Sequence, residues 1–144
     1  MKNPEWKWIV EPELAFTKIY HNSKRIYESV QICIIAINGI PYAIDKGTRI
    51  DGWTIPIFID MFFDLIRELW PPFVHDELYK KAGLYPKITR KIADQLLRDI
   101  ALDRGCQKRE VMIAYWAVRT FSGPIWKKYK KHNLKRINLP SRSE

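Results

Sequence analysis

The chain has 144 residues, of which 47% are hydrophobic and 28% are charged, and its formal net charge is +9. This length suits a single domain that buries its own core, and no apolar run approaches the ~18 residues of a membrane-spanning helix. The two cysteines lack the spacing of zinc ligands and the first residues are unlike a signal peptide, so we expect a soluble protein made in a reducing cytoplasm.

The N-terminal part of the chain predicts β-structure. Residues 6–10 alternate large apolar and polar side chains, and residues 30–37 form an apolar run long enough for a buried strand. The Asn-Gly pair that follows favours a tight hairpin turn into a second strand over residues 40–44. Pro41 places that second strand at a sheet edge, because proline has no N–H to donate to a neighbouring strand.

A loop over residues 46–56 then leads into the helical half of the chain. It carries Asp51, Gly52, Trp53 and Thr54. Loops of this kind can bring backbone carbonyls and a carboxylate to a metal ion. The same residues also suit a plain turn in which Thr54 caps the next helix, and the loop by itself does not distinguish the two.

Helical periodicity replaces strand alternation after this loop. The predicted helices cover residues 57–70, 71–82, 88–104 and 107–121. The second helix has prolines in its first turn, where their missing N–H costs nothing, and Gly83 at its end. Because the connection to the third helix is short, these two helices should form an antiparallel hairpin.

The order of the elements predicts the fold class. A small N-terminal antiparallel β region followed by about four helices is an α+β fold. We expect one domain over residues 1–126 and a basic C-terminal tail over residues 127–144.

The helical hairpin brings two reactive side chains to the same height. His75 lies nine residues before the turn at Leu84, and Asp94 lies ten residues after it. Both lie beside the apolar face of their helix, so the imidazole and the carboxylate are expected to meet. Such a pair can act as a general base and its orienting acid. It can equally be a buried histidine satisfied by a carboxylate, and Asp94 can instead pair with Arg90 or Arg98 on its own helix.

A second carboxylate, that of Asp76, directly follows the histidine. It is available to hold a metal ion, since carboxylates are the preferred ligands of hard cations. It can also pair with Lys80, which lies one helical turn further on. Spacing alone leaves both interpretations open.

Residues 127–144 carry most of the excess positive charge. They hold seven basic residues and one acidic residue, a net charge of +6. The basic residues include Lys127, Lys128, Lys130, Lys131, Lys135 and Arg136. Such a tail can bind a nucleic-acid backbone, an anionic lipid surface or an acidic protein, or it can simply aid solubility. Charge alone does not choose among these, and on its own we expect the tail to be mobile.

Several motifs together resemble a small family of unknown function that is common in tailed-phage genomes. The shared order is Gly47, Asp51-Gly52-x-Thr54-x-Pro56, His75-Asp76-x-x-Tyr79, Ala93-Asp94 and Ala117-Val118-Arg119, over roughly residues 42–126. Thr54 stands where the family usually has Ser, and Trp53 stands where it usually has a small residue, which would narrow what the loop admits. The resemblance implies a phage protein made in the host cytoplasm, with the virion as its destination and other virion proteins as partners.

The site is also similar, more remotely, to that of phospholipase A2. This similarity implies that His75 activates water, that Asp94 orients its ring and that Tyr79 supports Asp94. It further implies that Asp76 and Asp51 help to hold a divalent cation, calcium as the first guess, which polarises an ester carbonyl. The chain lacks the recognisable calcium loop beside the histidine helix.

Two functions remain as hypotheses. The first is a phage-encoded, virion-associated hydrolase of ester or lipid-like bonds that works with a metal ion. The second is a non-enzymatic virion or assembly component, in which the His-Asp-Asp cluster locks the helices and the basic tail binds DNA or an acidic partner. Access to the histidine distinguishes them. A catalytic His75 needs an open cleft, whereas a structural one should be sealed by Trp53, Phe73 or Trp116.

Overall fold

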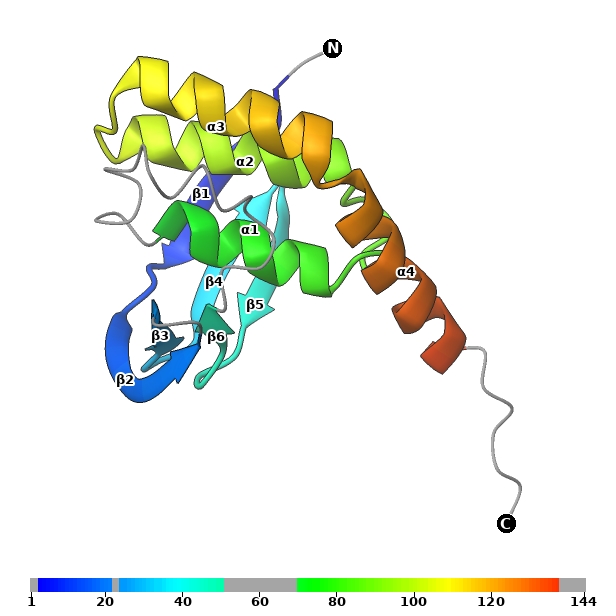
Figure 1. The fold of residues 1–144 in the computed structure, drawn as a ribbon, viewed down its shortest axis with the longest axis horizontal. Coiled ribbons are helices and arrows are strands. Elements are labelled where there is room, and N and C mark those ends of the chain that lie inside the picture. The colour runs from blue at the N-terminus through cyan, green and yellow to red at the C-terminus, as the bar shows by residue number, and fades with distance from the viewer. Residues whose placement is uncertain (1–2, 22–23, 51–69, 138–144) are drawn as a thin grey trace.

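The computed structural model describes residues 3–21, 24–50 and 70–137. Its strands are β1 (Trp6–Val10), β2 (Leu14–His21), β3 (Lys24–Ser29), β4 (Cys33–Ile37), β5 (Ile40–Ile44) and β6 (Arg49–Ile50). Its helices are α1 (Trp70–Lys80), α2 (Arg90–Asp103), α3 (Lys108–Phe121) and α4 (Gly123–Ile137). The strands precede the helices along the chain, which confirms the predicted α+β fold (Figure 1).

The first sheet has the strand order β1-β4-β5, with antiparallel neighbours, so β4 is its central strand. Cys33 and Ile35 on β4 are fully buried, as expected of a strand that faces the core. Asn38 and Gly39, with φ of 49° and 83°, make the tight turn into β5. Pro41 is exposed on β5, which is an edge strand. Both the hairpin and its edge position are therefore as predicted.

The strands of the second sheet, in the order β2-β3-β6, are absent from the sequence prediction. The register between β2 and β3 shifts between Phe16 and Tyr20. Such an irregularity breaks the two-residue alternation by which a strand is recognised. The predicted strand over residues 30–37 is also too long, because β4 begins only at Cys33 and the preceding Val30 and Ile32 are exposed.

The main core lies between β4 and the pair of helices α1 and α2. Its buried side chains include Ile35 and Ile37 from β4, Phe73, Val74 and Leu78 from α1, and Ala93, Leu96 and Ile100 from α2. α3 lies beside α2 (Figure 1) and packs through a smaller cluster around Val111 and Ala114. The helix predicted over residues 57–70 lies outside the described residues, except for Trp70, which begins α1. Among the described helices, none has the length and apolar character needed to cross a membrane.

The basic segment after residue 126 is helical over most of its length. α4 begins at the end of α3 and lies against the end of α1 (Figure 1). Trp126 belongs to the main core, and Asn133 Nδ2 donates 2.9 Å hydrogen bonds to the backbone carbonyls of Lys80 and Ala82. As far as Ile137, the structure therefore replaces the expected mobile tail with a packed helix.

Candidate functional site

The helices α1 and α2 form the predicted antiparallel hairpin and carry the candidate site (Figure 1). Two prolines stand in the first turn of α1, and Gly83, at a φ of 82°, reverses the chain after it. α2 begins after Thr89, whose side chain accepts a hydrogen bond from a backbone N–H in the first turn. These end signals fix where each helix starts and stops. As a result, His75 and Asp94 face each other across the pair.

The carboxylate of Asp94 is the centre of the site. His75 Nε2 lies 2.7 Å from Asp94 Oδ1, and the Tyr79 hydroxyl donates to the same oxygen at 2.6 Å. Arg119 Nη1 donates to Asp94 Oδ2 at 2.9 Å, and Arg90 Nη1 lies 3.6 Å from that oxygen. The side chains of His75, Tyr79 and Asp94 are fully buried. The predicted meeting of His75 with Asp94 is confirmed, and Tyr79 lies where the resemblance to phospholipase A2 places it.

The electrostatics of the site keep Asp94 charged and Tyr79 neutral. Burial alone would raise the pKa of Asp94, but its interaction with His75 and the hydrogen bonds from Tyr79 and Arg119 outweigh burial, so the pKa lies below its usual value. Burial raises the pKa of Tyr79, and the negative charge of Asp94 raises it further. The charged Asp94 carboxylate therefore accepts a hydrogen bond from the neutral Tyr79 hydroxyl.

The two ring nitrogens of His75 have different surroundings. A carboxylate only accepts hydrogen bonds, so the network assigns the proton of the neutral ring to Nε2 and the lone pair to Nδ1. Nδ1 is buried and has no hydrogen-bond partner among the residues that the structure describes. Buried polar atoms are usually paired, and in the described residues Trp8 Nε1 and Glu110 Oε2 share this lack of a partner with His75 Nδ1. A neutral His75 ring, held by Asp94 through Nε2, would present the lone pair of Nδ1 to no described partner.

The second carboxylate, that of Asp76, lies apart from this network. Asp76 is buried, and its Oδ2 lies 2.9 Å from Lys80 Nζ. The pairing that spacing offered as the alternative to a metal is therefore present. Within the described residues, no three His, Cys, Asp or Glu side chains form a group that could hold a metal ion. The other loop residues of the predicted site, Asp51, Gly52, Trp53 and Thr54, lie outside the described part of the chain.

Arg119 is the residue of the site that spacing did not predict. It comes from the last turn of α3, and the only signal for it was its place in the Ala-Val-Arg motif. Of the two arginines considered for Asp94 on its own helix, Arg90 is a partner, whereas Arg98 pairs with Asp99 at 2.8 Å. Arg90 also donates to two backbone carbonyls in the last turn of α3, at 3.1 and 3.3 Å. The arginines thus attach α3 to the site.

Access to the site is closed. His75 is 0% exposed, and the residues that the structure describes leave no open cleft at its ring. Of the residues expected to seal it, Phe73 is buried in the same core, Trp116 is 60% exposed, and Trp53 lies outside the described part of the chain. Tyr79 packs against the ring of His75 with 4.3 Å between ring centroids.

The six basic residues singled out in the C-terminal segment lie on α4, and all of them are exposed. They are Lys127, Lys128, Lys130, Lys131, Lys135 and Arg136. They lie on the surface of α4, whereas the Asp94 network is buried. Any role they have is therefore separate from the chemistry of His75.

Comparisons with known proteins bear on the central part of the chain. The sequence model of a family described as "Protein of unknown function (DUF1353)" matches residues 32–118, which is more than half of the chain. The matched range contains His75, Tyr79 and Asp94 and stops one residue before Arg119. The searches of curated proteins and of solved structures found no match.

Proposed function

Because this chain belongs to the family of proteins of unknown function called DUF1353, we propose its function from the Asp94 network: it is a hydrolase of ester or lipid-like bonds. His75 acts as the general base for water, and Asp94 holds its ring. The order of motifs resembles that of tailed-phage proteins, and the proposal includes a phage origin and association with the virion.

The observation that carries this proposal is the unused lone pair on His75 Nδ1. A histidine that only joins two helices gains most when both ring nitrogens are bonded, because an unsatisfied buried polar atom costs about 1–3 kcal/mol. Here Nε2 is bonded to a charged Asp94 and Nδ1 is left without a partner among the described residues. The proposed reaction uses this nitrogen as the base, and because His75 is 0% exposed it also requires an opening of the site that admits water and substrate.

Each residue of the network has a distinct role in the proposed reaction. Asp94 fixes the ring of His75 and stabilises the imidazolium that forms when Nδ1 takes a proton from water. Tyr79 and Arg119 hold the Asp94 carboxylate in place and keep it charged. They are positioning residues, because they act on Asp94.

The described residues do not by themselves fit the calcium ion that the resemblance to phospholipase A2 implies. Calcium takes six to eight oxygen ligands, whereas the one described carboxylate proposed for it, that of Asp76, is bonded to the ammonium group of Lys80. No step of the mechanism is therefore assigned to a metal. Calcium binding stays a prediction.

A second function is favoured by the complete burial of His75. In this alternative the protein is a non-enzymatic virion or assembly component, and the network locks α1, α2 and α3 together. The basic residues of α4 then bind an anionic partner, such as a nucleic acid, a lipid surface or an acidic protein.

The substitution His75→Gln separates the two functions. Glutamine keeps an N–H donor for Asp94 but has no basic nitrogen, so the first function predicts loss of hydrolysis by roughly 10²–10⁴-fold with little loss of stability. The measurement is hydrolysis of a p-nitrophenyl ester and of phospholipid vesicles, together with the melting midpoint. His132→Gln, on the exposed side of α4, is the matched control for hydrolysis of the soluble ester.

The two proposed functions predict different activities for these variants. Activity that His75→Gln removes and His132→Gln leaves intact supports the hydrolase. No hydrolysis by the wild type, or hydrolysis that persists in His75→Gln, overturns it and leaves the assembly component.

A further inference from the structure

The helix α4 presents two different sides. Its apolar side chains Ile125, Trp126 and Tyr129 pack into or against the main core. The opposite side carries two rows of basic side chains at every fourth position. One row is Lys127, Lys131 and Lys135, and the other is Lys128, His132 and Arg136. Along an α-helix, such positions follow each other at about 6 Å.

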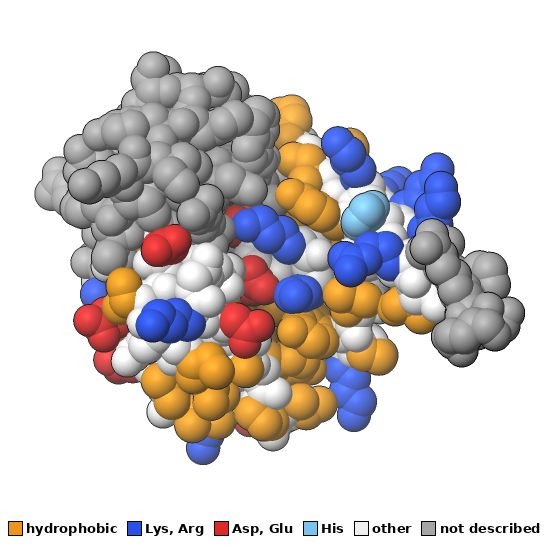
Figure 2. Space-filling model, turned by 90° about the horizontal axis from the view of Figure 1, so that it is seen from below, with side chains coloured by type: hydrophobic (Ala, Val, Ile, Leu, Met, Phe, Trp, Pro, Cys, Tyr) orange, Lys and Arg blue, Asp and Glu red, His pale blue; other side chains and the backbone are white. Residues whose placement is uncertain are grey.

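Both rows face solvent and are not neutralised. All six side chains are exposed, and the fifteen residues of α4 include no Asp or Glu. Within the described part of the chain, no carboxylate forms an ion pair with them. Figure 2 shows the Lys and Arg side chains gathered over this end of the molecule, away from the acidic side chains. We call these six side chains the basic ridge.

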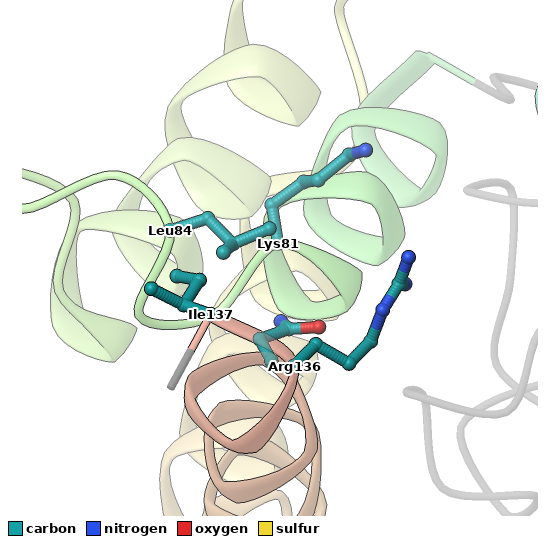
Figure 3. A pocket seen from close by; sticks show the side chains of 5 residues that line it. Lys81, Leu84, Arg136 and Ile137 are labelled. Carbon is teal, nitrogen blue, oxygen red and sulfur yellow. The ribbon is translucent and has the colours of Figure 1, made fainter. Parts of the chain in front are cut away.

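A shallow hollow continues the basic ridge onto α1. It measures about 350 Å³ and is lined by Lys81, Leu84, Asn133, Arg136 and Ile137. Figure 3 shows the charged ends of Lys81 and Arg136 on one side of the hollow, with Leu84 and Ile137 together on the other. Lys81 therefore lies beside the second row, although its ammonium group is also 3.9 Å from Glu77 Oε1.

The composition of the basic ridge favours a nucleic-acid duplex over a lipid surface or a single strand. A helix that binds a membrane surface inserts an apolar face between the lipids. On α4, Ile125, Trp126 and Tyr129 pack into or against the core, and the large exposed apolar side chains are only Leu134 and Ile137 near its end. Single-stranded nucleic acid is held largely by stacking on several aromatic side chains, and the two rows contain no Phe, Tyr or Trp. Regularly spaced lysines, which are hydrated point charges, suit a regular array of phosphates.

We propose that the basic ridge of α4 binds the phosphate backbone of double-stranded nucleic acid, without reading its sequence. This inference rests on the second proposed function, and it is independent of hydrolysis at His75. Because lysines neutralise phosphates as point charges, we expect an affinity that depends strongly on salt and little on sequence.

The test is binding of a short fluorescent DNA duplex to the full chain, measured by anisotropy over a series of salt concentrations. Each phosphate neutralised contributes about −0.9 to the slope of log affinity against log salt, so Lys127→Gln/Lys131→Gln/Lys135→Gln should make the slope shallower by roughly 3. Glutamine has nearly the helix propensity of lysine, so α4 is retained, as far-UV circular dichroism will check.

A matched control removes the same charge from elsewhere. Lys7, Lys46 and Lys87 are exposed and lie outside α4, so Lys7→Gln/Lys46→Gln/Lys87→Gln lowers the net charge equally. We expect its salt slope to stay close to that of the wild type. Equal effects of the two triple variants would show that overall charge, and not the basic ridge, drives binding, and would overturn the proposal.

Two further probes separate failure of this inference from failure of the function on which it rests. Binding to vesicles of anionic phospholipid, or to a single strand of the same length, in preference to the duplex would overturn the inference and leave an anionic partner in place. Binding to none of the three probes would overturn the inference and also the nucleic-acid and lipid arms of the second function.

Discussion

At the scale of single residues, the Asp94 carboxylate holds three helices together. It accepts from His75 and Tyr79 through one oxygen and from Arg119 through the other. These contacts lie between α1, α2 and α3. Loss of the charge would leave several buried or half-buried donors with a weaker acceptor, and so the effect should be visible in stability.

We predict that Asp94→Asn lowers the free energy of unfolding by about 1–3 kcal/mol at neutral pH, the cost of unsatisfied buried polar groups. The folded-state pKa of Asp94 is lowered, so its contribution is present above the unfolded pKa of about 3.9 and is lost as pH falls through the lower folded value. Wild type should therefore lose stability in that acid range, and Asp94→Asn should lose less there.

Urea unfolding at a series of acid pH values measures this difference. Asp99→Asn is the control, because Asp99 lies on the same helix but is partly exposed in its pairing with Arg98. If Asp99→Asn lowers the free energy of unfolding as much as Asp94→Asn does, then the buried network is not a principal source of stability.

How much of the site follows from the sequence depends on where each residue lies. His75 and Asp94 could be paired by counting from the turn, because a short connection between two helices fixes their relative height. Tyr79 follows from the i, i+4 spacing within α1. Arg119 could not be found in this way, since it comes from α3 and its position depends on how α3 packs on α2. Local spacing says nothing of that packing.

At the scale of elements, the junction between α1 and α4 is constrained by a glycine. Gly83 has a φ of 82°, and a Cβ there would lie 3.0 Å from Cγ of Lys130 on α4. Both the backbone conformation and the contact disfavour any larger residue. The end of α1 therefore helps to decide where α4 lies.

We predict that Gly83→Ala lowers the free energy of unfolding by more than Gly105→Ala does. Gly105 has nearly the same φ, 84°, but no heavy atom lies within 4 Å of its Cβ position. The backbone cost, about 1–2 kcal/mol for a left-handed L-residue, is therefore common to both variants. Chemical denaturation measures the free energy of unfolding of both variants. Equal losses would show that the Lys130 side chain moves aside without a cost in stability.

The elements also show which patterns in a sequence carry information. The Asn-Gly turn, the edge position of β5 and the limits of α1 and α3 follow from local signals, and the structure has them close to where they are expected. The hairpin of β2 and β3 is hidden by its register shift. α4 is hidden because its buried side chains, Trp126 and Asn133, are few and one of them is polar. Lysines dominate the rest of its pattern.

At the scale of the whole molecule, ligand binding to the folded state raises the melting midpoint, which gives a direct test of the calcium hypothesis. The hypothesis predicts that calcium raises the midpoint of wild type and that Asp76→Asn removes the rise. Because the ammonium group of Lys80 competes for the same carboxylate, Lys80→Gln should give a larger rise than wild type. A midpoint that calcium leaves unchanged in each of the three proteins would exclude calcium at Asp76.

Because of the two hydrogen bonds from Asn133, we expect α4 and the end of α1 to unfold locally together. Its amide group donates to the backbone carbonyls of Lys80 and Ala82, which lie where α1 has no further turn to satisfy its own acceptors. Detachment of α4 would strip those carbonyls of their donor, so the last turn of α1 and the middle of α4 should behave as one cooperative unit in native-state hydrogen exchange. A partner held by α4 would then slow amide exchange in the helix that carries His75, although it touches only the outer surface.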